Sequence, residues 1–214
     1  METLAILRVT LQVALCATLL VAPFALATGW LLARREFPLK AAFETLVALP
    51  LILPPTAIGY LLLALLARTG PLPFDPGILF TWKAAVLASA VVAFPLSART
   101  ARAAFEAVDP RLESMGRSLG LSRARVLASV TLPLARPGLF AALALAFGRA
   151  LGEFGATVIV AGNMPGRTQT LALAIFEDIQ LGREDRALFL VGLTTAIAFG
   201  VLLLVERLQR RRAA

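Results

Sequence analysis

The chain has 214 residues, 59% of them hydrophobic, and a formal net charge of +8 at pH 7. A soluble domain with a mean hydropathy of +0.83 would leave much apolar surface in water, so the composition excludes that class and predicts a membrane protein. The chain has no histidine and one cysteine, Cys16, which excludes zinc sites, His-dependent catalytic triads and an intramolecular disulfide.

Five apolar runs are long enough, at roughly 20 residues or more, to cross the hydrocarbon core of a bilayer as helices. None of them alternates apolar and polar residues with the period of two that a barrel strand requires, which leaves helices as the spanning structure. The predicted fold class is therefore all-α, a polytopic membrane helix bundle of about five to six transmembrane helices. The runs cover residues 9–33, 43–67, 84–104, 134–161 and 187–205.

Tandem prolines interrupt the second run. Pro54 and Pro55 lack the backbone N–H that a helix needs, so they free carbonyl groups near the middle of the membrane. Those carbonyls need partners, which neighbouring helices or a water-lined path can supply. A kink that serves packing alone and a segment that lines a conduit both fit this pattern, and a conduit would be lined by Pro54, Pro55 and Thr56.

The segment 109–133 is too polar for lipid but is patterned as two short helices. The boundary signals are Asp109 and Pro110 at the start of the first helix, Gly120 at its end, Ser122 at the start of the second and Pro133 at its end. The apolar edges are Leu112, Met115 and Leu119 in the first helix and Val126, Leu127 and Val130 in the second. This pattern predicts either a docking surface or amphipathic helices lying on lipid head groups.

The fourth run carries small residues and a pair of charges. Ala144, Gly148 and Gly152 recur every four residues, a stripe that lets a second helix approach closely. Arg149 and Glu153 are also four residues apart, so on one helical face they can neutralise each other. Charges at this depth are costly and normally face the bundle interior. The pair is therefore interpreted either as a structural ion pair or as part of a conduit.

Beyond the fourth run, glycines and Pro165 are expected to break the helix near the outer face, and residues 171–179 are expected to form a short outer helix. The arginines and lysines fall mainly on alternate connecting segments, which the positive-inside rule assigns to the cytoplasm. These cytoplasmic residues are Arg34, Arg35, Lys40, Arg99, Arg102, Arg111, Arg117, Arg123, Arg125, Arg136, Arg207, Arg210, Arg211 and Arg212. The charge distribution thus predicts an outer N-terminus, a cytoplasmic C-terminus and a cytoplasmic segment 109–133.

The charged segment resembles the EAA loop of permease subunits in bacterial ABC importers, in which a glutamate and alanines precede a glycine and a hydrophobic-x-Leu-Pro sequence closes the loop. The matching residues are Glu113, Gly120, Val130, Leu132 and Pro133, while Ser114, Met115 and Gly116 replace most of the alanine run. The resemblance implies a loop that sits in a groove of a separate cytoplasmic ATPase and transmits its movement.

A second, more specific resemblance covers residues 151–173, with Leu53-Pro54-Pro55-Thr56 and Phe94-Pro95-Leu96. These blocks, including GEFGAT and GN-x-PG-x-TQTL, are similar to those of molybdate ABC transporter permeases. The resemblance implies a single transmembrane domain over residues 1–214, with a type I, methionine-importer-like fold and a coupling loop at about 106–133. It implies import of molybdate by alternating access, with tungstate left open. The alternatives are a sulfate or thiosulfate permease and, less favoured, a secondary oxyanion transporter or channel.

The same resemblance implies an assembly in the bacterial cytoplasmic membrane. Two permease copies would form a homodimer, two cytoplasmic ATP-binding subunits would grip the coupling loop, and a periplasmic or extracellular oxyanion-binding protein would dock outside. Neither Lys40 nor Lys83 follows a glycine as a P-loop lysine does, so ATP and Mg²⁺ are expected on the partner ATPase and no cofactor or catalysis on this chain. The positive charge lies at membrane edges, and no nucleic-acid partner is expected.

Two groups of residues form the candidate site. Those expected to couple to the ATPase are Arg111, Leu112, Glu113, Met115, Gly116, Leu119, Gly120, Arg123 and Arg125. Those expected to line or gate the pathway are Pro54, Pro55, Thr56, Arg149, Gly152, Glu153, Phe154, Gly155 and Thr157. Because an ionised, unpaired Glu153 would repel an anion, we expect it to be a structural or gating group paired with an arginine. None of these residues is expected to be catalytic or to bind a metal.

Overall fold

The computed structural model describes residues 2–68, 70, 71 and 77–210, and every regular element in this part of the chain is helical. In chain order the elements are α1 (Glu2–Arg34), α2 (Lys40–Ile52), α3 (Pro55–Leu66), α4 (Trp82–Glu106), α5 (Pro110–Ser118), α6 (Arg123–Val126), the π-helical turn η1 (Leu127–Thr131), α7 (Leu132–Leu151), α8 (Gly155–Ala161), α9 (Leu171–Gln180) and α10 (Glu184–Arg210). Arg211, Arg212 and the side chain of Arg210, which the charge distribution includes, lie outside the described residues.

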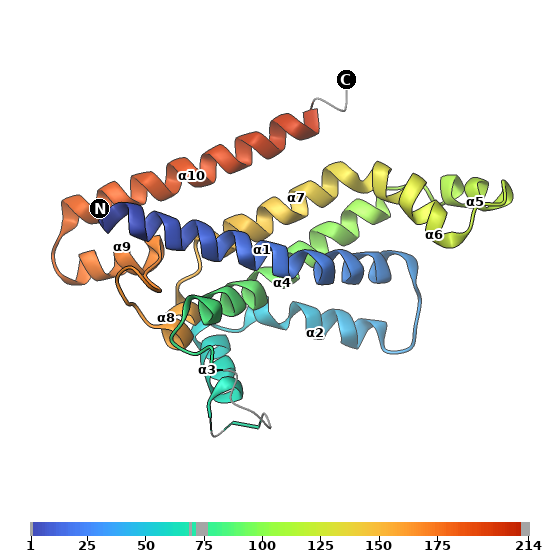
Figure 1. Ribbon diagram of the computed structural model, residues 1–214. Helices are drawn as coiled ribbons and strands as arrows, with labels where there is room; N and C mark the ends of the chain where they lie inside the picture. The colour runs from blue at the N-terminus through green and yellow to red at the C-terminus, as the bar shows by residue number, and fades with distance from the viewer. Residues whose placement is uncertain (1, 69, 72–76, 211–214) are drawn as a thin grey trace.

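Helices α1, α4 and α7 run side by side along the long axis of the molecule and form its centre (Figure 1). Small residues allow this close packing. A Cβ added to Gly29 of α1 would come within 2.8 Å of the Ala101 Cβ in α4. A Cβ on Gly138 of α7 would lie 2.5 Å from the Ala104 Cβ. Because alanine and glycine occupy these two contacts, the helix backbones approach closely there and gain dispersion energy.

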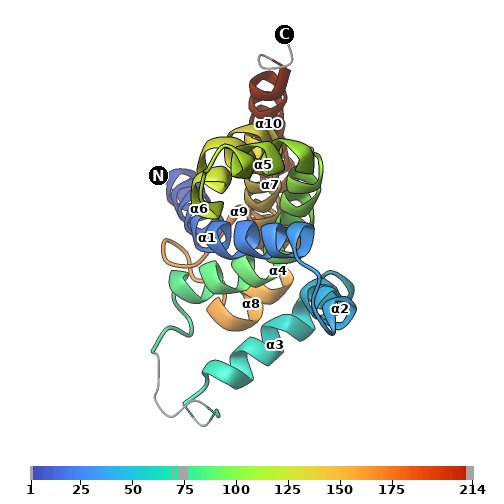
Figure 2. The same cartoon turned by 90° about the vertical axis from the view of Figure 1, so that its right-hand side faces the viewer.

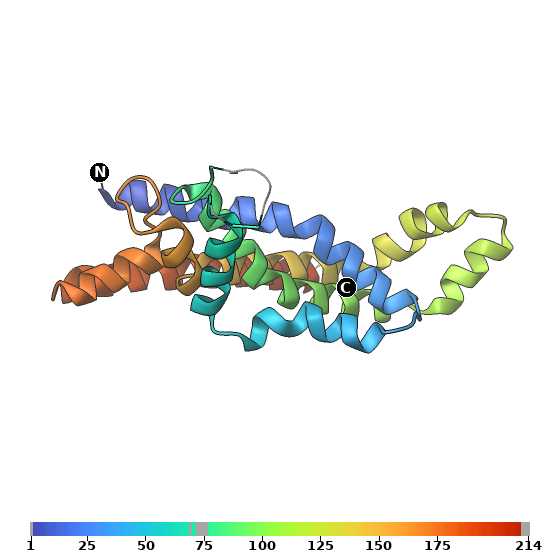
Figure 3. The ribbon, with the colours of Figure 1, turned by 90° about the horizontal axis from the view of Figure 1, so that it is seen from below.

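The second apolar run is broken at its tandem prolines, as the sequence predicts. The run is divided into α2 and α3, which are bent by 107° relative to each other and meet at an angle in the view from below (Figure 3). Leu53 has an extended backbone, with ψ 139, because the residue before a proline avoids the helical region. Pro55 then begins α3, where its missing N–H has no intrahelical acceptor to satisfy.

The prediction that Pro133 ends the second helix of the charged segment is wrong. Helices α6 and α7 join through η1 into one continuous rod, Arg123–Leu151, of 29 residues. In η1 the Leu132 N–H bonds to the Leu127 carbonyl, five residues back. This wider turn accommodates a proline that has no N–H to donate.

The predicted fourth span, residues 134–161, is likewise two helices rather than one. Helix α7 ends at Leu151, Gly152 follows as its C-cap, and α8 begins at Gly155. The physical reason is local: the Glu153 side chain accepts a hydrogen bond from the Ala156 N–H, so it satisfies a donor in the first turn of the new helix.

The two ends of the molecule carry different short helices. Helices α5 and α6 project from one end, whereas α9 and the N-terminus lie near the other (Figure 1). The end-on view places α3 and α8 together on the flank opposite α10 (Figure 2). The helix predicted at residues 171–179 is confirmed as α9, and its location at the outer face stays a prediction. Four helices of the described chain are long and apolar enough to cross a membrane, or five spans if α2 and α3 count as one.

Candidate functional site

The projecting end is built as the boundary signals predict. Asp109 caps α5 by accepting a hydrogen bond from the Arg111 N–H at 2.8 Å. Ser122 caps α6 by accepting one from the Arg125 N–H at 3.3 Å. Between them Gly120 adopts φ +84, a left-handed conformation that a residue with a Cβ adopts at a cost. The chain therefore reverses direction at Gly120 and sets the two short helices side by side.

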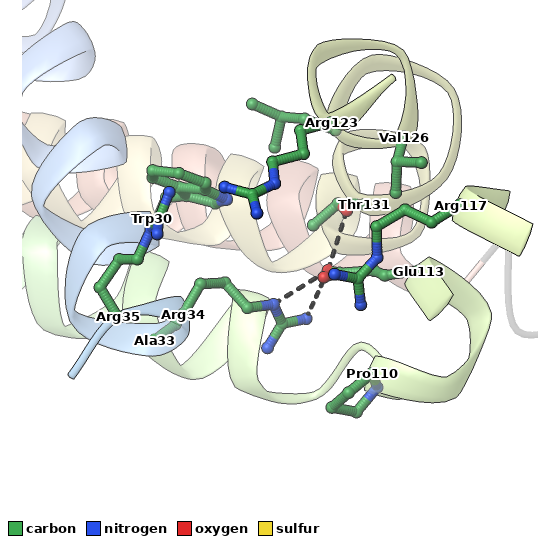
Figure 4. A pocket seen from close by; sticks show the side chains of 11 residues that line it. Trp30, Ala33, Arg34, Arg35, Pro110, Glu113, Arg117, Arg123, Val126 and Thr131 are labelled. Atoms are coloured by element: carbon green, nitrogen blue, oxygen red, sulfur yellow. Dashed lines mark hydrogen bonds and ion pairs between the residues drawn. The ribbon is translucent and has the colours of Figure 1, made fainter. Parts of the chain in front are cut away.

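Glu113 points inward from α5 and joins three elements (Figure 4). Its Oε1 atom accepts hydrogen bonds from Nε of Arg34, at the end of α1, and from the Thr131 hydroxyl in η1, both at 2.9 Å. A second nitrogen of Arg34 lies 2.9 Å from the same oxygen and also donates to the Val108 carbonyl. The sequence singles out Glu113 as a residue for docking, but in this chain the carboxylate fixes α5 to α1 and to the Arg123–Leu151 rod.

Gly116 has a similar internal role. It is buried, and a Cβ added there would lie 3.2 Å from Cγ2 of Val126 in α6. The small side chain thus lets α5 pack on α6. Of the predicted coupling residues, Glu113 joins α5 to α1 and η1, Gly116 packs against α6, and the others are exposed.

The exposed members form an apolar edge flanked by arginines. Leu112, Met115 and Leu119 lie on α5 and its C-terminal end, and Leu119 exposes 82% of its surface. Met115 and Leu119 border a shallow hollow together with Arg111. An exposed apolar edge of this kind is suited to bind a second protein.

At the far end of the rod, Arg149 and Glu153 form the expected ion pair, with Arg149 Nη1 2.8 Å from Glu153 Oε2. The glutamate side chain is 1% exposed and the arginine side chain 31% exposed. Glu153 lies beyond the end of α7 rather than on its face, and its other oxygen accepts from the Ala156 N–H at 2.8 Å. One carboxylate therefore neutralises an arginine and fixes the start of α8.

The two helix breaks that the sequence associates with a pathway lie against each other. A Cβ added to Gly155 would be 2.9 Å from the Pro55 Cβ and 3.3 Å from the Thr56 backbone nitrogen. A Cβ on Gly59 would be 2.9 Å from the Ala156 Cα. The α2–α3 break and the start of α8 thus form one unit, with Pro54 and Thr56 exposed on its surface.

The remaining predicted pathway residues differ from one another in burial and in the groups they contact. Thr157 is fully buried, and its hydroxyl has no hydrogen-bond partner among the described residues. The Phe154 ring packs on Phe176 of α9, with centroids 4.8 Å apart. Gly152 is exposed, as is Gly148 one turn earlier, and nothing within 4 Å would meet a Cβ on Gly148. Within this chain the small-residue stripe therefore borders open space.

The loop after α8 contains polar residues whose role the sequence leaves undefined. The side-chain amides of Asn163 and Gln169 both donate to Glu177 Oε2 of α9 at 2.6 Å. The Leu171 N–H donates to the Thr10 hydroxyl of α1 at 2.8 Å. These contacts anchor the loop at both ends. The only sequence signal for them is the clustering of amide and hydroxyl side chains between two helices.

Residues 25–213 match the protein family described as binding-protein-dependent transport system inner membrane component. The chain belongs to this family. It is 42% identical to the molybdenum transport system permease protein ModB of Escherichia coli K12, over 95% of this chain and 93% of that protein. It is also 42% identical to ModB of Haemophilus influenzae, over 96% and 93%. It is 31% identical to the sulfate transport system permease protein CysT of Salmonella typhimurium, over 98% and 78%.

Solved structures of two importers share the fold of this family member. The MetNI methionine ABC transporter in an inward-facing conformation gives a TM-score of 0.75 at 17% identity, covering 98% of this chain and 96% of that one. A bacterial ABC transporter that imports alginate gives 0.79 at 17% identity, covering 98% and 79%. The predicted type I ABC importer permease fold is thus confirmed, and the chain is a multi-pass inner membrane protein.

Proposed function

We propose that this chain is the permease subunit of an ATP-driven importer for molybdate. The observation that carries the proposal is 42% identity over nearly the whole chain to molybdenum transport permeases, compared with 31% to a sulfate permease. A relative named for molybdate and tungstate transport, WtpB of Thermococcus kodakarensis, is 33% identical over 92% of this chain. Tungstate has the same charge and tetrahedral shape as molybdate and is the expected second substrate.

Competition uptake tests this substrate. Cells that express the complete transporter should take up labelled molybdate, and unlabelled tungstate should compete for that uptake whereas sulfate should not. The matched control is the same strain without this permease. Strong competition by sulfate would favour the sulfate or thiosulfate alternative.

The proposed assembly contains two copies of this chain, two cytoplasmic ATPase subunits and an external binding protein for the oxyanion. ATP and Mg²⁺ would bind the ATPase subunits, and the permease would carry no cofactor and perform no covalent chemistry. The whole chain would act as one transmembrane domain, with the coupling loop at its cytoplasmic end. The concentration of arginines around α5 and α6 supports this orientation.

We propose that the exposed apolar edge of α5 binds the ATPase. Leu119→Glu places a charge on a side chain that is already 82% exposed, so the permease should still fold. The ATPase subunits should no longer co-purify with it, since the charge would have to be buried in their contact. Leu119→Met keeps the side chain apolar and is the matched control. Retention of the ATPase by Leu119→Glu would contradict this docking surface, whereas absence of any ATPase from the unaltered permease would favour a transporter that works without one.

The Arg123–Leu151 rod supplies a mechanical connection between docking and pathway. At about 1.5 Å per residue, its 29 residues span roughly 43 Å, comparable to the thickness of a membrane. One end packs on α5 through Gly116 and Val126, and the other carries Arg149. We propose that the Arg149–Glu153 pair and the neighbouring α3–α8 unit form the gate. Movement imposed on α5 would therefore displace this gate.

A tetrahedral dianion needs compensating positive charge while it crosses the membrane core. Arg149 is about one-third exposed on the open side of α7, next to Gly148 and Gly152. Glu153 neutralises part of its charge and is itself buried, so it does not present a bare carboxylate to the anion. We propose that this arrangement lets the path attract an oxyanion without holding it tightly.

A further inference from the structure

A cavity lies between the end of α1 and the α5–α6 pair, at the side of the coupling segment (Figure 4). Its volume is about 430 Å³, within the range of about 300–1,000 Å³ typical of sites for small ligands. Arginines supply most of its charged lining: Arg34, Arg35, Arg117 and Arg123. The apolar part of the wall includes Trp30 and Val126.

Among the described residues, the positive charge in this cavity exceeds the negative charge that faces it. The lining contains one carboxylate, Glu113, and its Oε1 is already bonded to Arg34 and Thr131. Arg35 lies over the Trp30 ring at 5.9 Å, and Arg117 donates to the Ser114 hydroxyl at 3.0 Å. In the part of the chain that the structure describes, neither of these arginines nor Arg123 forms an ion pair with a carboxylate.

Three guanidinium groups around one cavity repel one another unless an anion lies between them. The planar guanidinium group, with its fork of N–H donors, matches the oxygens of a phosphate group, to which it can donate two parallel hydrogen bonds. Arg35 directly follows α1, Arg117 lies in α5 and Arg123 lies in α6, so the three can approach a tetrahedral group from several directions. The cavity is therefore suited to a phosphate group.

Its position indicates where that phosphate comes from. The apolar sequence of α1 ends at Ala33, immediately before Arg34 and Arg35, and basic residues of this kind mark the boundary between hydrocarbon and head groups. Trp30 lies one turn further in, where tryptophan is enriched at the membrane interface. Basic pockets beside transmembrane helices at this depth bind anionic lipid head groups.

We propose that this cavity binds the phosphate group of an anionic phospholipid, with Arg35, Arg117 and Arg123 as its ligands. The lipid would then bridge the end of α1 and the coupling helix α5, next to the Arg34–Glu113 bond that already joins them. Binding there would restrain α5 relative to the bilayer surface. The inference does not depend on which oxyanion the transporter carries.

Native mass spectrometry of the complete transporter, released from nanodiscs of equal parts phosphatidylglycerol and phosphatidylcholine, tests the proposal. The unaltered complex should retain phosphatidylglycerol, and Arg35→Gln with Arg117→Gln should weaken its retention by about tenfold or more, since each basic residue near a membrane surface contributes to anionic lipid binding. Arg99→Gln with Arg136→Gln removes the same charge from exposed residues outside the cavity and should retain the lipid. Arg35→Gln alone is a second variant in case the double variant does not fold.

Three outcomes would overturn the proposal. Equal lipid retention by the cavity variants and the control variant would show that the cavity is not the site. The cavity would be assigned to free phosphate by two results together. Inorganic phosphate would displace the lipid, and in phosphatidylcholine alone it would protect the complex against thermal unfolding as well as the lipid does. Loss of the ATPase subunits from the cavity variants but not from the control would show that acidic residues of the partner fill it. Each result is independent of molybdate uptake, so it leaves the proposed function untouched.

Discussion

Glu113 and Glu153, which the sequence assigns to coupling and to the pathway, both interact with other residues of this chain. Glu113 accepts from Arg34 and Thr131, and Glu153 pairs with Arg149 and caps α8. Glu113 joins α5 to an element far away in sequence, whereas Glu153 joins the consecutive helices α7 and α8. A charge at such a position is retained because its removal leaves a positive or hydrogen-bonding group without a partner.

Glu153→Gln should slow transport while the complex still assembles. The amide keeps the shape of the side chain and can still accept from the Ala156 N–H, but it no longer neutralises Arg149. We expect molybdate uptake to fall by roughly tenfold, which corresponds to about 1.4 kcal/mol. Glu106→Gln is the matched control, because Glu106 also pairs with an arginine four residues away, Arg102, at an exposed position. Normal uptake by Glu153→Gln would exclude the pair from gating.

At the scale of elements, helix boundaries decide how the molecule is organised. Prolines act differently at the α2–α3 break and at the start of α7. Pro54 and Pro55 end α2 and start α3 with a 107° bend, whereas Pro133 sits inside a continuous rod because η1 widens the preceding turn. The proline itself is the same residue in both places. The difference lies in whether the preceding turn can rearrange its hydrogen bonds.

Gly155→Ala tests the contact between α3 and α8. The added methyl group would lie 2.9 Å from the Pro55 Cβ, so the helices must separate, and overpacking of this kind costs about 1–3 kcal/mol. We expect a lower unfolding temperature of the purified complex and slower uptake. Gly192→Ala in α10 adds the same group where nothing lies within 4 Å and should leave both unchanged. Equal stability of the two variants would contradict the tight α3–α8 contact.

For the whole molecule, the basic residues are distributed unevenly along its long axis. The end that carries α5 and α6 is rich in arginine, and α9 and the N-terminus lie toward the opposite end (Figure 1). In the proposed orientation the ATPase would act on the first end and the binding protein on the second. The Arg123–Leu151 rod connects them across the membrane.

Cysteine labelling tests the orientation. After Cys16→Ser removes the single native cysteine, Arg167→Cys should react with a membrane-impermeant maleimide in intact spheroplasts. Ala107→Cys, at the junction of α4 and α5, should react only after the membrane is permeabilised, because the positive-inside rule assigns this junction to the cytoplasm. Both positions are exposed, so each serves as the accessibility control for the other. The reverse labelling pattern would overturn the proposed topology.

Composition, run length and capping residues were enough to predict an all-helical membrane protein, the boundaries of α5, the start of α6, α9 and the Arg149–Glu153 pair. These features depend on bilayer thickness, on backbone hydrogen bonds at helix ends and on side chains four residues apart, all of which are local along the chain. Only the tertiary structure showed that Glu113 bonds to Arg34, that Gly155 packs on Pro55, that Thr157 is buried and that three unpaired arginines surround one cavity. Those facts depend on contacts between residues as far as 100 positions apart, and no local pattern specifies which helix faces meet.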